Sequence, residues 1–63
     1  MSEKFTDLLK KLLVMEYFKT EDEADRLIKT YPNVIVNGIF SGNLRATAMA
    51  LEFVENIKIN DNK

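Results

Sequence analysis

The chain contains neither cysteine nor histidine, so a fold of 63 residues has to hold together without a disulfide or a conventional zinc site. A domain of this size buries roughly 60% of the surface that its unfolded chain exposes. The gain from that burial, on the order of 95 kcal/mol, is about equal to the free-energy cost of ordering the chain. The sequence therefore predicts one small domain, residues 1–63, that is marginally stable alone and gains stability from a partner subunit.

Apolar residues at helical spacing predict a first helix over residues 2–18. One apolar stripe faces the expected core, and a second apolar group emerges near the carboxyl end of the helix. The stripe comprises Phe5, Leu8, Leu9, Leu12, Leu13 and Met15, and the second group comprises Val14, Tyr17 and Phe18. Glu16 falls inside the stripe. We expect it either to pair with Arg45 or a lysine, or to mark the point at which the helix leaves the core.

Local signals also define a second helix. Thr20 and Glu23 have the spacing of a capping box, and acidic residues fill the first turn, where the helix dipole favours them. Pro32 predicts an end near Thr30 or Tyr31, because the residue before a proline disfavours the helical conformation. The loop before Thr20 is one or two residues long, so the first two helices should be close neighbours.

Residues 33–42 have two interpretations. Asn37-Gly38 between two short apolar runs is typical of a β-hairpin over residues 34–40. The strands would be only about three residues long, and no alternation of apolar and polar residues is present. A short helix that ends at Gly42 in a left-handed conformation is therefore favoured. The predicted fold is all-α, a small bundle of three main helices plus one short helix, and an α+β fold with that hairpin is the alternative.

The last helix is expected to begin after Asn43 as N-cap and to run to about Ile57. Residues 59–63 are expected to form a frayed carboxyl-terminal tail. The helix is apolar on almost every side, which is typical of a helix buried on most of its faces. Alanines at positions 46, 48 and 50 would allow a neighbouring backbone to approach closely.

Catalysis is not expected from this sequence. The chain offers no thiol or imidazole, and it contains no nucleophile elbow, phosphate loop or nucleotide-binding fingerprint. The acidic cluster over residues 21–25 is explained by the dipole of the second helix rather than by a metal site. We expect no enzymatic activity, no cofactor and no metal.

The turn before the last helix is the alternative functional site. Free amides at a helix N-terminus, a nearby hydroxyl and an arginine can bind the phosphate of a nucleotide or nucleic acid. The candidate anion-binding residues are Ser41, Gly42, Asn43, Arg45 and Thr47. The same residues also make an ordinary helix break and cap. The isoelectric point of 5.3 and the scattered basic residues argue against a general nucleic-acid binder.

An excess of apolar surface favours binding to another macromolecule. We expect a small non-enzymatic protein that associates with itself, most simply as a homodimer, or with an unidentified protein partner. The candidate interface residues are Val14, Tyr17, Phe18, Phe53 and Ile57.

The expected location is the cytoplasm. The longest apolar run, residues 12–15, is too short to cross a membrane, and no signal-peptide pattern occurs. The abundance of Lys, Asn and Ile is typical of an AT-rich genome. We therefore expect a bacterial or phage-infected host cell, in which the protein would regulate or inhibit a larger assembly.

Overall fold

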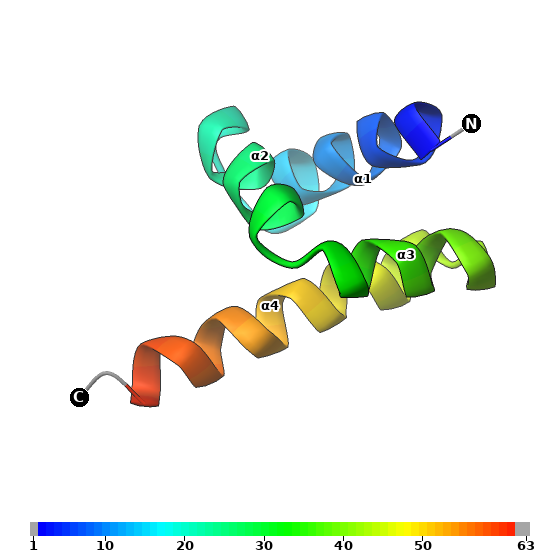
Figure 1. Cartoon of the computed structure of the whole chain (residues 1–63). Helices are drawn as coiled ribbons and strands as arrows, with labels where there is room; N and C mark the ends of the chain where they lie inside the picture. Colours follow the sequence, from blue (N-terminus) through cyan, green and yellow to red (C-terminus); the bar gives the residue numbers. More distant parts are fainter. Residues whose placement is uncertain (1, 62–63) are drawn as a thin grey trace.

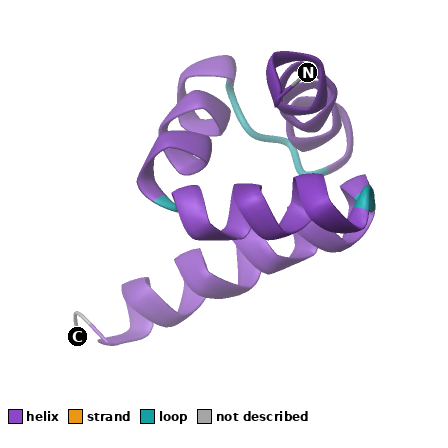
Figure 2. Cartoon of the chain, turned by 45° about the vertical axis from the view of Figure 1, so that its right-hand side comes forward, coloured by secondary structure: helices purple, strands orange, loops and turns teal. Residues whose placement is uncertain are grey.

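A computed structural model of the chain describes residues 2–61 and the side chains of residues 4–58. The described residues form four helices and no strand: α1 (Ser2–Glu16), α2 (Glu21–Thr30), α3 (Pro32–Ser41) and α4 (Leu44–Asp61) (Figure 1). Figure 2 shows α3 and α4 running side by side in opposite directions, with α1 and α2 above them. The predicted all-α fold is confirmed, and the hairpin over residues 34–40 is wrong because that whole segment is helical.

The start of α2 follows the local signal in its sequence. The backbone N–H of Glu23 donates to Thr20 Oγ1 at 3.1 Å, and the backbone N–H of Thr20 donates to Glu23 Oε1 at 3.0 Å. These two bonds complete the predicted capping box. Pro32 does more than end α2, because it is the first residue of α3, a position where the missing N–H of proline costs nothing.

The structure differs from the sequence prediction at two helix ends. α1 ends at Glu16, two residues early, and Phe18 takes a left-handed backbone conformation with φ of 57°. α4 continues to Asp61, so the expected end near Ile57 is too early. No glycine or proline follows Ile57 to stop the helix. Residues 59–61 of the expected tail are thus helical in their backbone, and residues 62–63 lie outside the described residues.

The core lies between the four helices, where α1 packs on both α4 and α2, and α3 packs on α4. Its buried apolar side chains come from every helix: Leu9, Leu13, Ala24, Leu27, Ile35, Ala48 and Leu51. Leu9 and Leu13 of α1 thus lie in the same buried cluster as Ala48 and Leu51 of α4. No helix in the described part of the chain has the length and apolar character needed to cross a bilayer.

The close contact of α3 with α4 depends on Gly38. This glycine is buried, and a Cβ atom built on it would lie 2.8 Å from Thr47 Cγ2. Thr47 is itself buried, and its hydroxyl donates to the carbonyl of Asn43 at 2.8 Å. The two helices are therefore held together at a point where only hydrogen fits on the α3 side.

Candidate functional site

Nine large apolar side chains in the described part of the chain remain exposed. They are Leu8, Met15, Phe18, Val36, Ile39, Phe40, Met49, Phe53 and Ile57. Scattered exposed apolar residues are normal in a folded protein, whereas contiguous groups mark interaction surfaces. The question is therefore which of these side chains lie together.

Phe18 is the most unusual of the nine, because its backbone is strained and its ring is 89% exposed. A left-handed conformation costs a residue with a Cβ atom about 1–2 kcal/mol. Here it serves the end of α1, where the carbonyl of Leu13 accepts from the N–H groups of both Tyr17 and Lys19. Glycine would make the same turn without the strain, so the aromatic ring adds nothing that the turn requires.

Met49, Phe53 and Ile57 form an exposed row along α4, which we call the α4 stripe. Their spacing of four residues places them on one side of the helix. The stripe is bordered by two ion pairs with the end of α1: Lys19 Nζ lies 2.9 Å from Glu52, and Arg45 binds Glu16 through both carboxylate oxygens at 2.9 and 3.2 Å. Phe18 and Phe53 are the sequence neighbours of Lys19 and Glu52, so this ion pair joins their two segments.

The structure separates two of the predicted interface residues from the others. Val14 and Tyr17 are half-buried and pack against the core, because α2 covers that flank of α1. The ion pair of Lys10 with Asp25, at 3.2 Å, fixes this cover. Val14 and Tyr17 therefore do not share the exposure of Phe18. Phe53 and Ile57 are exposed as predicted, and Met49 completes their row although the sequence analysis missed it.

The predicted anion-binding residues come together, but their polar groups already bond within the chain. Asn43 Oδ1 accepts from the N–H of Ala46 at 3.0 Å, which is the N-cap of α4. Ser41 Oγ donates to the carbonyl of Gly38 and accepts from the N–H of Asn43. Gly42 is the left-handed cap of α3, Thr47 is buried, and the guanidinium of Arg45 is held by Glu16. The turn thus caps two helices and presents no free arginine.

Among the residues whose side chains the structure describes, two titratable groups have shifted pKa values, and both shifts come from contacts that hold helices. The hydrogen bonds from the backbone and hydroxyl of Thr20 lower the pKa of Glu23. The hydrogen bond to Asp25 raises the pKa of Lys10. Lys10 lines a hollow between α1 and α2 together with Glu21, and no three carboxylates among the described residues converge on a metal-binding point.

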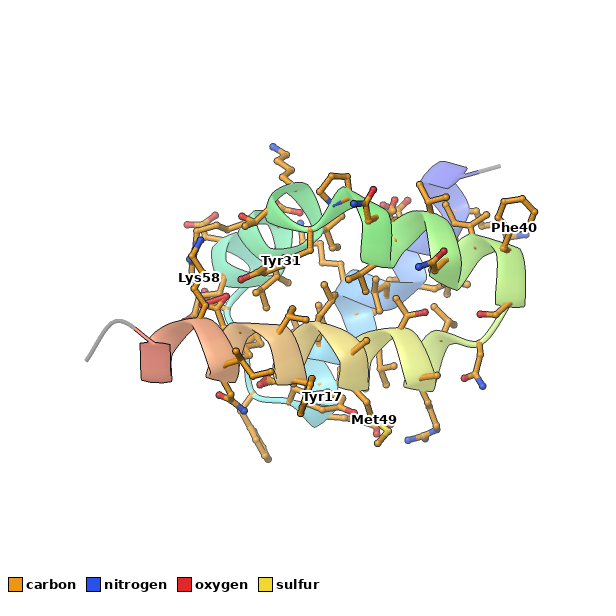
Figure 3. The ribbon with its side chains drawn as sticks, turned by 60° about the horizontal axis from the view of Figure 1, so that its bottom comes forward. Tyr17, Tyr31, Phe40, Met49 and Lys58 are labelled. Atoms are coloured by element: carbon orange, nitrogen blue, oxygen red, sulfur yellow. The ribbon has the colours of Figure 1, made fainter. Side chains whose placement is uncertain are left out.

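A second exposed apolar surface lies on α3, a segment to which the sequence assigned no interface residue. Val36 and Phe40 are 52% and 89% exposed, and Figure 3 shows Phe40 projecting away from the body of the molecule. On the opposite side of α3, where it meets α4, the two helices border a separate hollow of about 300 Å³ lined by Val34, Asn37, Gly38, Ser41, Ala46, Thr47 and Ala50. The sequence does carry a signal for this surface, because Arg45 is the single charged residue between Lys29 and Glu52.

Neither protein-family models, nor curated proteins, nor solved structures match this chain. Its function has to be argued from the residues and their geometry. The described residues carry two exposed apolar surfaces: Phe18 with the α4 stripe, and the outer side of α3 with Val36 and Phe40.

Proposed function

We propose that this protein is a non-enzymatic binding protein, and that Phe18 and the α4 stripe bind a protein partner. The observation that carries the proposal is Phe18, which combines a left-handed backbone with a ring that the fold leaves 89% exposed. Backbone strain of this kind persists where a residue serves something other than the stability of its own chain. An exposed aromatic ring is a common anchor at protein interfaces.

The surroundings of Phe18 support an apolar anchor with a polar rim. Met49 and Phe53 are 62% and 65% exposed, and methionine and phenylalanine are enriched at interfaces. The charges beside them are already paired, Lys19 with Glu52 and Arg45 with Glu16. A partner would therefore cover apolar area without having to strip water from an unpaired charge.

The finer role is part of the proposal. A protein of this size that binds through one apolar surface suits the regulation or inhibition of a larger assembly. We place that role in the cytoplasm of a bacterial or phage-infected cell, on the composition of the sequence. The turn over residues 41–47 supports no second function, since its polar groups are bonded within the chain.

Site-specific photocrosslinking in the source cell tests the proposal. A photoreactive phenylalanine analogue replaces Phe18 in one variant and Phe53 in another, and Lys29, an exposed residue on α2, in the control. We expect the first two to give the same discrete adduct with another protein and the control to give none. Excess wild-type protein should suppress the adduct, whereas excess Phe18→Gly should not.

Two outcomes would contradict the proposal. One is the absence of any adduct at positions 18 and 53, and the other is an adduct that forms equally well at position 29. An adduct whose mass equals two copies of this chain would assign the surface to self-association instead of to a separate partner.

A further inference from the structure

We infer that Met49 is an oxidation site, and that its conversion to methionine sulfoxide by peroxides releases the partner from the α4 stripe. The inference rests on the proposed function, because it concerns the regulation of that same surface. The chain contains no cysteine, so methionine sulfur is the only sulfur that it offers to an oxidant.

The sulfur of Met49 is open to solvent. Met49 is 62% exposed, so a peroxide in solution reaches it while the protein is folded and free of its partner. Met15 of α1 is 76% exposed, but it lines the hollows beside Lys11 and is not part of the α4 stripe. The two methionines therefore offer the same chemistry with similar access at two different places.

Met49 lies where the α4 stripe adjoins the segment that carries Phe18. Residues three and four apart are neighbours on a helix surface, so Met49 lies next to both Arg45 and Glu52. Each of these two neighbours forms an ion pair with an end of the segment over residues 16–19. A partner that covers Phe18 and the α4 stripe together therefore also covers Met49, near the middle of the contact, where side chains contribute most to binding.

The chemical step balances with hydrogen peroxide as the oxidant. The sulfur of Met49 donates a lone pair to one peroxide oxygen, a sulfur–oxygen bond forms, and the oxygen–oxygen bond breaks. The proton left on the transferred oxygen passes to the departing hydroxide. The thioether is oxidised to the sulfoxide, and the peroxide is reduced to water.

The sulfoxide acts on binding rather than on the fold. In the free protein its oxygen is hydrated, because Met49 faces solvent. A bound partner would have to remove that water from a polar group, at a cost that the thioether does not carry. The other polar groups beside Met49 are the charges of Arg45 and Glu52, which are already paired. Oxidation would thus introduce the unfavourable desolvation that the unmodified surface avoids.

The test combines oxidation with photocrosslinking. Purified protein with the photoreactive analogue at position 18 is treated with hydrogen peroxide, freed of peroxide by catalase, and irradiated in an untreated extract of the source cell. We expect the adduct to fall roughly five-fold or more, and peptide mass spectrometry to place one added oxygen on Met49. Reduction by methionine sulfoxide reductases for both epimers should restore the adduct. Urea denaturation of the oxidised protein should give an unchanged free energy of unfolding.

Two leucine variants separate this site from general oxidative damage. Met49→Leu keeps a similar apolar volume but has no sulfur, so its adduct should survive peroxide. Met15→Leu is the matched control, and its adduct should be lost as in the wild type. Restoration of the Met15→Leu adduct by the reductases tests Met49 without altering that residue.

The inference is overturned if peroxide leaves Met49 unmodified, if the adduct persists after Met49 is oxidised, or if its loss occurs equally in Met49→Leu. Protection by Met15→Leu would overturn it as well. In each of these cases the untreated protein still forms the adduct, so the proposed function stands. An untreated protein that forms no adduct is a distinct result, in which the proposed function fails and this inference fails with it.

Discussion

At the scale of single residues, the conformation of Phe18 lowers the stability of the fold, while its exposed ring is part of the surface that we propose binds a partner. Its left-handed φ of 57° costs free energy that the exposed ring does not recover within the chain. Phe40 has the same exposure but lies in regular helix. The two phenylalanines should therefore respond in opposite ways to the same substitution.

We predict that Phe18→Gly raises the free energy of unfolding by up to about 1 kcal/mol, because glycine adopts this backbone without strain. Phe40→Gly should lower it by about 1 kcal/mol, because glycine is unfavourable inside a helix. Urea denaturation of each variant, at a concentration where the protein is monomeric, gives both values. Destabilisation by Phe18→Gly would show that the ring supports the fold.

Tyr31 presents a different residue-scale feature, a hydroxyl oxygen that is buried without a hydrogen-bond partner. Its ring packs against the core. An unsatisfied buried hydroxyl costs about 1–3 kcal/mol, so Tyr31→Phe should stabilise the protein by about 1 kcal/mol in thermal or urea unfolding. The half-buried Tyr17 has no such orphaned oxygen, so Tyr17→Phe should change stability little. A loss of stability in Tyr31→Phe would mean that a bound water satisfies the hydroxyl.

At the scale of helices, the features that depend on neighbouring residues could be predicted from the sequence. The features that depend on contacts between helices could not. The capping box at Thr20, the stop at Pro32 and the cap at Gly42 each depend on a few neighbouring residues, and the structure has all three. The burial of Val14 and Tyr17 depends instead on where α2 lies. The exposure of Phe40 depends on which side of α3 meets α4, which periodicity alone leaves open because α3 is apolar on several sides.

The contact between α3 and α4 should not tolerate a methyl group. We predict that Gly38→Ala lowers the free energy of unfolding by about 2–3 kcal/mol, since the new Cβ would overlap the side chain of Thr47. Thr47→Ala in the same chain should restore part of the loss, which a double-mutant cycle measures. Gly42→Ala is the control, with no atom within 4 Å of the new Cβ but a φ of 68°, and should cost only about 1 kcal/mol. Equal losses at both glycines would contradict this account.

The capping box should make the stability of α2 depend on pH. Thr20 lowers the pKa of Glu23 in the folded chain, so this contribution is fully present above the pKa of the unfolded chain. It is then lost as the pH falls through the lowered pKa of the folded state. Glu23→Gln retains an acceptor oxygen but does not titrate. The difference in unfolding midpoint between wild type and Glu23→Gln should therefore shrink between pH 7 and pH 3, and a constant difference would contradict the assignment.

At the scale of the whole molecule, the charged side chains are distributed unevenly among the helices. The charged side chains gather on α1, α2 and the second half of α4, and α3 has none. The paired charges of α1 with α4 stabilise the monomer modestly, since exposed ion pairs contribute little. The two surfaces thus differ in character as well as in position, one bordered by ion pairs and one without charge.

The packing of α1 against α4 has a consequence for synthesis on the ribosome. Leu9 and Leu13 of α1 share their core cluster with Ala48 and Leu51 of α4, which are translated more than thirty residues later. At the usual elongation rate of 5–20 residues per second, the first helix waits roughly 2–8 s for its counterpart. During that interval its leucines have only α2 and α3 to cover them. The nascent chain therefore reaches its native core only after Leu51 of α4 has been added, and a chain cut short before that helix would expose the same leucines to chaperones and proteases.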